Sequence, residues 1–458
     1  MIHHRSILEW RKINYGPGED EIPQWAADRL AAVAKASPLG GDDGARILQH
    51  ARSFLKAQQV VGIIAAEGCS LEILPKIDGL GDGDSDESKS QIRQNLVHML
   101  ATALDLDIAS GQMAELGRQK ENLLEILIRL FCEKLFGALH RGLPRRYAGF
   151  EDDLPKLRGR LDVKRQFTSL AAAPDRLACR FDELSSDIPL NQIMKAAVRR
   201  LMTISRSERN QRRLRELGFA LADIRDVPIK QLPWDQVILD RTNSRWKDLL
   251  ALARLLLGDR FQTTTSGQGT GFSLLFEMNK LFEEYVGRLI RRACAGTGLT
   301  VHLQGGRLHC LAELDDDLAP TGARRFMTKP DIIVRRGSNP VIIIDTKWKR
   351  LAASIDDPKQ GVSQGDVYQM MAYGQIYDCR NLMLLYPHHG GLGRRAGAIS
   401  NHNIVGSDKL LNTATLNLTE ISTGRAQISQ LLSAVTQFNR NTQIDHAVDV
   451  SRLNGLIN

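Results

Sequence analysis

The feature that most constrains the fold is an uninterrupted apolar run at residues 341–344, which leads into Asp345-Thr346-Lys347. A strand with one face in water alternates apolar and polar residues, whereas this run is apolar at every position. That pattern is typical of a strand buried on both faces, as in the central sheet of an α/β domain. A carboxylate and an ammonium at the end of a buried strand are costly unless they have partners. The run therefore predicts a central strand that ends in a polar site.

A second β-type run supplies another carboxylate. Residues 326–334 carry Asp331 directly ahead of a short apolar stretch, and a Gly-containing turn separates them from the first run. The two runs are therefore expected to form a hairpin-like pair of strands. Because positions i and i+2 of a strand share a face, Asp345 and Lys347 should point into one site, which Asp331 reaches from the neighbouring strand.

The residue types at this predicted site favour metal-dependent hydrolysis of a phosphodiester bond. Asp331, Asp345 and the backbone carbonyl of Thr346 offer hard oxygen ligands that suit Mg²⁺, with Mn²⁺ as a substitute. Lys347 cannot bind a cation, and we expect it beside the attacking water and the scissile phosphate, where it stabilises negative charge. The alternative is a buried Asp–Lys ion pair with a purely structural role. The second carboxylate on the adjacent strand favours the catalytic interpretation.

Two expected helices flank the pair of strands. Apolar residues recur at helical spacing over residues 272–294, and Glu283 and Glu284 lie off that stripe. One of these two acids is a candidate to complete the metal site, but periodicity does not choose between them. In a second helix, over residues 366–377, Gln369 and Tyr373 share a face at i and i+4. They are expected either to orient the site or to contact the DNA backbone, and a plain structural role for Tyr373 is equally open.

The length, charge, apolar runs and cysteines of the sequence restrict the class of protein to which it can belong. A chain of 458 residues is too long for one hydrophobic core, so two or three domains are expected. The net charge of +8 and the pI near 9.2 favour a polyanionic partner such as DNA. The sequence has no run long enough to span a membrane and no apolar leader, which predicts a cytoplasmic protein. The six cysteines form no C-x-x-C pair, so a zinc or disulfide framework is not expected.

The chain divides into three segments by pattern. Residues 1–80 predict a small β-rich domain with a hairpin around Glu67-Gly68, and an acidic, Gly-rich linker follows at residues 79–88. Residues 91–260 are mainly helical, with an extended interruption that ends in a basic cluster. The Thr- and Gly-rich stretch at residues 263–271 predicts the clearest linker in the chain. Residues 271–458 then read as an α/β domain with a mixed central sheet flanked by helices.

The motifs together resemble a known family. Pro330-Asp331, Asp345-Thr346-Lys347 and the helix with Gln369 and Tyr373 are similar to the RecB-like branch of the PD-(D/E)XK nucleases. The wider layout is similar to the McrC family, the nuclease subunits of McrBC modification-dependent restriction systems. The segments that carry this wider likeness are residues 72–77, 157–161, 191–195 and 278–283.

The resemblance implies more than the spacing does. It implies a restriction-endonuclease-like fold for residues 271–458 and favours Glu283 over Glu284 as the acid of the metal site. It implies a Mg²⁺-dependent DNA endonuclease subunit of a two-component phage-defence system. Residues 1–80 and 91–260 would dock onto a hexameric, McrB-like AAA+ GTPase and stimulate its hydrolysis, with residues 157–161 as a candidate docking surface. GTP would enter only through that partner, since this sequence contains no G-x-x-x-x-G-K-[ST] phosphate-binding loop.

Two other functions stay open at the level of sequence. One is a self-sufficient RecB-like nuclease of DNA repair or recombination, which would cut DNA with Mg²⁺ alone. The other is a non-cleaving adaptor whose task is to activate an AAA+ partner. The presence of every expected type of site residue argues against an inactive site.

Overall fold

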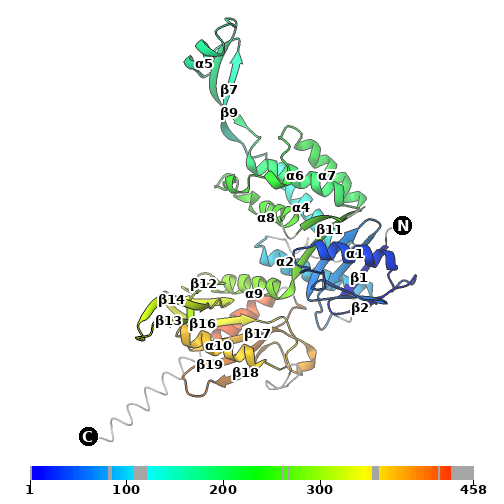
Figure 1. Cartoon of the computed structure of the whole chain (residues 1–458), viewed down its shortest axis with the longest axis vertical. Coiled ribbons are helices and arrows are strands. Elements are labelled where there is room, and N and C mark those ends of the chain that lie inside the picture. Colours follow the sequence, from blue (N-terminus) through cyan, green and yellow to red (C-terminus); the bar gives the residue numbers. More distant parts are fainter. Residues whose placement is uncertain are drawn as a thin grey trace. The chain divides into compact units, whose positions relative to one another are not determined.

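The computed structural model describes residues 3–80, 85–106, 121–258, 261–266, 269–352, 361–420 and 423–434 (Figure 1). The chain forms two compact units, of which unit 1 comprises Met1–Lys120 with Thr264–Asn458, and unit 2 comprises Glu121–Thr263. This grouping differs from the three consecutive segments expected from the sequence. In the part of the chain that the structure describes, no helix is long and apolar enough to cross a membrane.

The N-terminal part of unit 1 is built on a five-stranded sheet. Its strands lie in the order β1 (His3–Leu8), β6 (Cys69–Leu74), β5 (Val60–Ala66), β11 (Gly269–Glu277) and β10 (Phe261–Ser266). Strands β5 and β6 form the expected hairpin, with Gly68 in the left-handed conformation of its turn. A small second sheet has the order β2 (Lys12–Asn14), β4 (Phe54–Ala57) and β3 (Leu48–His50).

The linker expected at residues 263–271 is wrong where the structure describes it, because residues 263–266 lie in β10 and residues 269–271 in β11. Residues 267 and 268 lie outside the described residues. Strand β11 pairs antiparallel with β5, with Leu274 opposite Ile63. The helix expected from residue 272 begins instead at Met278, and residues 272–277 belong to β11. Apolar side chains such as Leu274 and Leu275 fit helical spacing in the sequence, but cross-strand pairing with the buried β5 decides their conformation.

Two helices cover the N-terminal part. Helix α1 (Gln24–Ala36) buries an alanine-rich face that includes Leu30 in one hydrophobic core with strands β5 and β6. Helix α2 (Asp86–Ala103) begins at Ser85, whose hydroxyl accepts a hydrogen bond from the backbone N–H of Ser88. The end of the expected acidic linker is therefore the capped first turn of a helix, while residues 81–84 of that linker lie outside the described residues.

The C-terminal part of unit 1 contains a six-stranded mixed sheet, which agrees with the expected α/β class. The strand order is β12 (Thr300–Leu303), β15 (Ile332–Arg336), β16 (Asn339–Thr346), β17 (Asn381–Pro387), β19 (Leu410–Leu416) and β18 (Gly397–Asn403). Strands β15 and β16 form the expected antiparallel hairpin. Strand β16 then pairs in parallel with β17, and its last four residues are all buried, as the apolar run predicts.

Helices and a ribbon accompany this sheet. Helix α9 (Met278–Cys294) packs its apolar stripe against β12 and β16, and helix α10 (Gln364–Ile376) packs against β16 and β17. The short helix η4 (Gly390–Leu392) follows β17. A separate two-stranded ribbon, β13 (His309–Leu314) and β14 (Pro320–Met327), lies between β12 and β15 in the chain.

Unit 2 joins a helical bundle to a three-stranded sheet that was not expected. The bundle consists of α4 (Leu123–Leu139), α6 (Pro189–Ile204), α7 (Glu208–Ala220) and α8 (Lys247–Leu257), with the short helices η1 (Ile229–Gln231), η2 (Trp234–Gln236) and η3 (Ser244–Trp246). The sheet has the order β7 (Arg146–Leu154), β9 (Leu177–Ser185) and β8 (Arg160–Leu161), with α5 (Val163–Thr168) beside it. Within this unit, β7, β9 and α5 extend away from the bundle (Figure 1).

Candidate functional site

The acidic residues predicted from the two β runs come together at one end of the β15–β16 hairpin. Asp331 directly precedes β15, and Asp345 is the second-last residue of β16, where only 2% of it is exposed. The backbone N–H and the hydroxyl of Thr346 both donate to Asp331 Oδ2, at 2.8 and 2.9 Å. Thr346 thus holds the carboxylate of Asp331 beside β16. Its carbonyl as a metal ligand stays a prediction.

Lys347 lies at the same site, as its spacing from Asp345 predicts. Its Nζ is 2.7 Å from Asp345 Oδ2 and 3.4 Å from Asp366 Oδ1. Lys349 also pairs with Asp366, with 2.6 Å between Nζ and Oδ2. The lysine of the motif is therefore held between two carboxylates, one from the sheet and one from helix α10.

Asp366 was not singled out from the sequence, although a signal for its position was present. Ser363 is the N-cap of α10, and its hydroxyl accepts a hydrogen bond from the backbone N–H of Asp366. A serine followed three residues later by an acid is a common start of a helix. The pattern locates the first turn of α10, but only the packing of α10 against β16 shows that this turn faces Lys347.

Gln369 connects the helix to both charged residues of the strand. Its Nε2 donates to Asp345 Oδ1 at 3.4 Å and to the Tyr373 hydroxyl at 2.7 Å, while its Oε1 accepts from Lys347 Nζ at 3.4 Å. Tyr373 is buried, and its hydroxyl is linked to Asp345 through Gln369. Gln369 and Tyr373 thus share a face, as the i, i+4 spacing predicts, and whether they orient the site or contact DNA stays a prediction.

The carboxylates of the site repel one another. Burial, and then the negative charge of Glu283, raise the pKa of Asp331 to about 6. Burial and the charge of Asp331 raise the pKa of Asp345 to about 6 as well. Burial also raises the pKa of Glu283, and the charges of Glu284 and Asp345 add smaller increases. The charge of Glu283 is thus coupled to the two aspartates, while its choice over Glu284 as a metal ligand stays a prediction.

This arrangement fits a hard divalent cation held by few protein ligands. Within the described ranges, no group of three or more His, Cys, Asp or Glu residues lies close enough together to hold a metal ion. The two aspartates nevertheless match Mg²⁺, which keeps several waters and uses one or two carboxylates. Among the described residues, no donor reaches the buried Asp345 Oδ2 at a hydrogen-bonding angle, although Lys347 is ion-paired to it. A divalent cation between the two aspartates would offset their mutual repulsion, which the single ammonium of Lys347 offsets only in part.

Trp348, the residue after Lys347, is held by hydrogen bonding to Glu9, which directly follows strand β1 of the N-terminal sheet. The Trp348 indole Nε1–H donates to Glu9 Oε1 at 2.8 Å, and the backbone N–H of Lys76 donates to the same oxygen at 3.0 Å. The backbone N–H of Trp348 donates to Asn279 Oδ1 at 3.2 Å, and its ring packs edge-on against Phe282. The segment that carries Lys347 is therefore fixed by a carboxylate more than 300 residues away in the sequence.

The contact between Glu9 and Trp348 predicts an unusual dependence of stability on pH. Burial raises the pKa of Glu9 to about 7, and the two hydrogen bonds only partly oppose it. Because the folded pKa lies above the unfolded one, Glu9 stabilises the fold at acidic pH, and this contribution is lost as pH rises through about 7. We expect Glu9→Gln to melt at a higher temperature than the wild type at pH 8. Its melting temperature should also fall less than that of the wild type between pH 5 and pH 8, as measured by calorimetry.

Glu72 in the same sheet is the matched control for Glu9. Burial tends to raise its pKa, but the hydrogen bonds and the charge of Arg93 lower it overall. A lowered pKa contributes stability above the unfolded value, so Glu72→Gln should melt lower than the wild type at pH 8. Equal melting changes for both variants at pH 8 would contradict the opposite environments of the two carboxylates.

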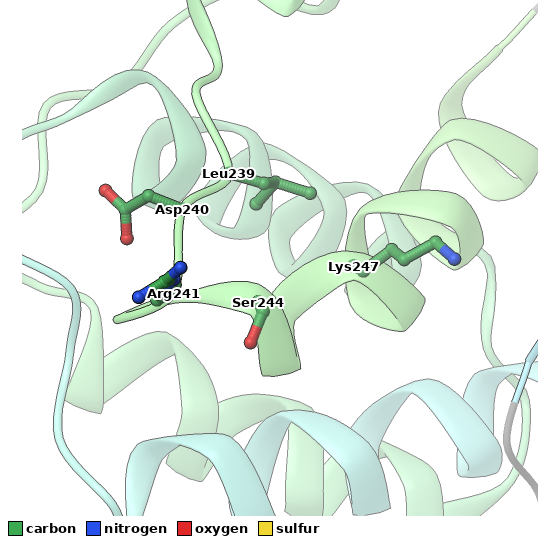
Figure 2. Close-up of a pocket in the computed structure, with 5 residues that line it drawn as sticks. All are labelled: Leu239, Asp240, Arg241, Ser244 and Lys247. Carbon is green, nitrogen blue, oxygen red and sulfur yellow. The ribbon is translucent and has the colours of Figure 1, made fainter.

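A cavity in unit 2 does not belong to this acidic site. It has a volume of about 510 Å³ and is lined by Leu239, Asp240, Arg241, Ser244 and Lys247 (Figure 2). The Asp240 carboxylate already accepts hydrogen bonds from the backbone N–H and the hydroxyl of Thr242. None of the residues expected to take part in catalysis lines this cavity.

Comparison with protein families gave one match. Residues 55–387 match the family described as McrBC 5-methylcytosine restriction system component. A search of curated proteins found no match.

Among the solved structures that resemble the chain are two of McrBC assemblies. One is a chain of the refined half-complex from the tetradecameric assembly of Thermococcus gammatolerans McrB AAA+ hexamers with bound McrC. It is 21% identical with a TM-score of 0.68, and the match covers 94% of this chain and 100% of that one. A chain of the cryo-EM structure of the Thermococcus gammatolerans McrBC complex is 24% identical with a TM-score of 0.50, covering 64% of this chain and 88% of that one. At these identities the likeness shows a shared fold.

Proposed function

Because the chain belongs to the family of McrBC 5-methylcytosine restriction system components, which confirms the family expected from its motifs, we propose that it is the DNA endonuclease subunit of such a system. The observation that carries this proposal is the meeting of Asp331, Asp345 and Lys347 at the end of a buried strand. A structural ion pair needs one carboxylate for one lysine. Here three acids raise one another's pKa, which is an expensive arrangement without a cation.

The proposed metal is Mg²⁺, with Mn²⁺ as a substitute. Asp331 and Asp345 would hold it, with the Thr346 carbonyl as a further oxygen donor. Glu283 is not close enough to form a three-acid site with them in the described residues, so it would join by moving closer or through a bound water. When bound, the ion would lower the pKa of a coordinated water and neutralise charge on the phosphate.

The protein's own residues would then perform three tasks. The Lys347 ammonium would stabilise the negative charge that develops on the scissile phosphate. Gln369 and Asp366 would hold that ammonium in place, since both contact it already. Thr346 would keep Asp331 in one orientation through its two hydrogen bonds.

We propose unit 2 as the main docking region for an AAA+ GTPase partner that moves along or reshapes the DNA. Its β7–β9–β8 sheet, α5 and the connection between β7 and β8 expose several large apolar side chains, as expected of a protein-binding surface. These side chains are Tyr147, Phe150, Leu157, Val163, Phe167 and Leu184. Leu157 belongs to the segment, residues 157–161, that the sequence proposed for docking.

The partner would bring the nucleotide chemistry and the recognition of modified DNA to the cytoplasmic complex. The solved relative that matches over most of this chain comes from an assembly of McrB AAA+ hexamers with bound McrC. The proposal for this chain is that it stimulates hydrolysis by an equivalent ring and cuts DNA in response.

The proposal is tested by reconstitution. The purified chain is mixed with an McrB-like AAA+ protein from the same organism, and cleavage of methylated and unmethylated plasmid is followed with Mg²⁺ and GTP or ATP. We expect cleavage only with the partner, the nucleotide and the metal together. Cleavage with Mg²⁺ alone would instead indicate a self-sufficient repair nuclease. Stimulated hydrolysis without any cleavage would indicate a non-cleaving adaptor.

A further inference from the structure

The ribbon β13–β14 contributes almost nothing to the hydrophobic core. Every residue of β14 is exposed, and so is every residue of β13 after the first. The exposed positions nevertheless include several large apolar side chains, which burial in the fold does not explain. They are Leu308, Leu311, Leu314, Leu318, Phe326 and Met327.

The base of the ribbon is firmly held close to the candidate site. The backbone N–H of Thr328 donates to the Leu308 carbonyl at 2.7 Å, and the Thr328 hydroxyl is 2.7 Å from that of Tyr377. Thr328 is three residues before Asp331, and the Asp331 carbonyl accepts a hydrogen bond from the backbone N–H of Gln304 at 2.7 Å. The ribbon is therefore an arm whose fixed end adjoins the acidic cluster.

Charge is unevenly distributed along this arm. The acids Asp315, Asp316 and Asp317 lie at the turn, far from the catalytic carboxylates. Arg307 and Lys329 lie beside the base, Arg324 lies opposite Ala312 near the middle of the ribbon, and all three are exposed. The neighbouring Arg325 is paired with Glu313. In the part of the chain that the structure describes, neither Arg307 nor Arg324 has an ion-pair partner. The arm thus presents positive charge close to the place where a phosphate would be cut.

Phe326 adds an independent signal. Its φ is +53°, a conformation that costs a residue with a side chain about 1 kcal/mol or more, and 74% of the residue is exposed. Because the ring is exposed and the backbone is strained, Phe326 does not stabilise the folded state. Strain of this kind is found where a side chain is aimed at a ligand.

We propose that the ribbon β13–β14 is a DNA-binding arm, an inference that rests on the proposed DNA cleavage. A two-stranded ribbon fits into the major groove of a DNA duplex. Arg307 and Arg324 neutralise backbone phosphates beside the scissile bond, while Phe326 makes an apolar contact with the duplex. The arm therefore sets the position of the duplex relative to Asp331 and Asp345.

The first test measures binding apart from cleavage. The full-length chain is titrated in EDTA against a fluorescently labelled DNA duplex at several salt concentrations, and anisotropy is recorded. We expect Arg307→Gln with Arg324→Gln to weaken binding about tenfold or more. The slope of log affinity against log salt should fall by about two, roughly one for each lost phosphate contact. The control, Arg336→Gln with Arg395→Gln, removes the same charge from two exposed arginines outside the arm and should leave both values unchanged.

The second test uses the strain at Phe326. Phe326→Gly removes the ring and also relieves the positive φ, so the protein should melt at the same temperature as the wild type or higher. Its affinity for the duplex should nevertheless fall several-fold, and Phe326→Ala should lose affinity to a similar degree. A lower melting temperature for Phe326→Gly with unchanged affinity would show a purely structural role.

The outcomes separate the arm from the proposed nuclease. The proposal that the ribbon binds DNA is wrong if the wild-type chain fails to bind the duplex at low salt, or if the arm variants bind as the wild type does. Cleavage by the reconstituted complex tests the proposed nuclease separately from the ribbon. Arm variants that cut DNA at the wild-type rate would support the nuclease and contradict the role of the arm. In that case only the inference about the ribbon is overturned.

Discussion

Asp345→Ala is expected to abolish metal-dependent DNA cleavage, with a loss of about a thousandfold or more, while the fold stays intact. Asp345 contacts Lys347 and Gln369, and its carboxylate is the proposed ligand in the centre of the cluster. Its loss removes water activation and phosphate polarisation together, which are worth several kcal/mol. The measurement is plasmid cleavage by the reconstituted complex. Wild-type cleavage by the variant would rule out this site.

Stability and metal binding provide the controls for Asp345→Ala. Because the carboxylates repel one another in a buried place, the variant should melt at or above the wild-type temperature at pH 8 without metal. Lys347→Ala should lose most of the cleavage rate but still bind Mn²⁺ in calorimetry, since a lysine does not ligate the ion. Asp331→Ala should lose Mn²⁺ binding. Equal loss of binding in the lysine and aspartate variants would contradict the roles given to them.

The second large effect is expected at the surface of unit 2. Leu157→Ala together with Phe167→Ala should weaken docking of the AAA+ partner on the order of a hundredfold, because buried apolar anchors dominate the binding energy of interfaces. Both side chains are more than half exposed in the chain by itself, so their removal should not destabilise the fold. The measurement is stimulated GTP or ATP turnover by the partner as a function of the concentration of this chain.

A matched pair of substitutions distinguishes docking from general damage. Phe219→Ala with Ile238→Ala removes an equally exposed aromatic and an equally exposed aliphatic residue from unit 2, outside the β7–β9–β8 sheet and α5. This control should stimulate turnover as the wild type does. If it impairs turnover as much as the first pair, the docking surface is not confined to the three-stranded sheet.

Local patterns predicted part of the fold well. The fully apolar run before Asp345 gave a strand buried in the centre of a mixed sheet, because few other structures accommodate such a run. The hairpin at Gly68 followed from its turn residue and the two β-type runs beside it. The threonines near residue 263 were less clear, since a Thr- and Gly-rich stretch suits a linker while β-branched residues also favour strands. Pairing with a distant strand settled that choice.

The candidate site was predictable only where its residues share one hairpin or one helix face. Asp331, Asp345 and Lys347 lie close in sequence, so strand periodicity brings them together. The contact of Asp366 with Lys347 depends on how α10 packs against the sheet, and the contact of Glu9 with Trp348 joins residues 339 positions apart. Such contacts leave no periodic signal in a single sequence.

The pairing of β11 with β5 determines how unit 2 is inserted into the rest of the chain. Strand β11 follows unit 2 in the sequence but pairs with β5, which precedes unit 2, so unit 2 is an insertion within a continuous fold. A chain cut near residue 260 would expose β5, which is buried almost throughout, as an open apolar edge prone to aggregation. The length of unit 2 can therefore change without breaking the pairing of β5 with β11, whereas that pairing ties the residues before unit 2 to those after it.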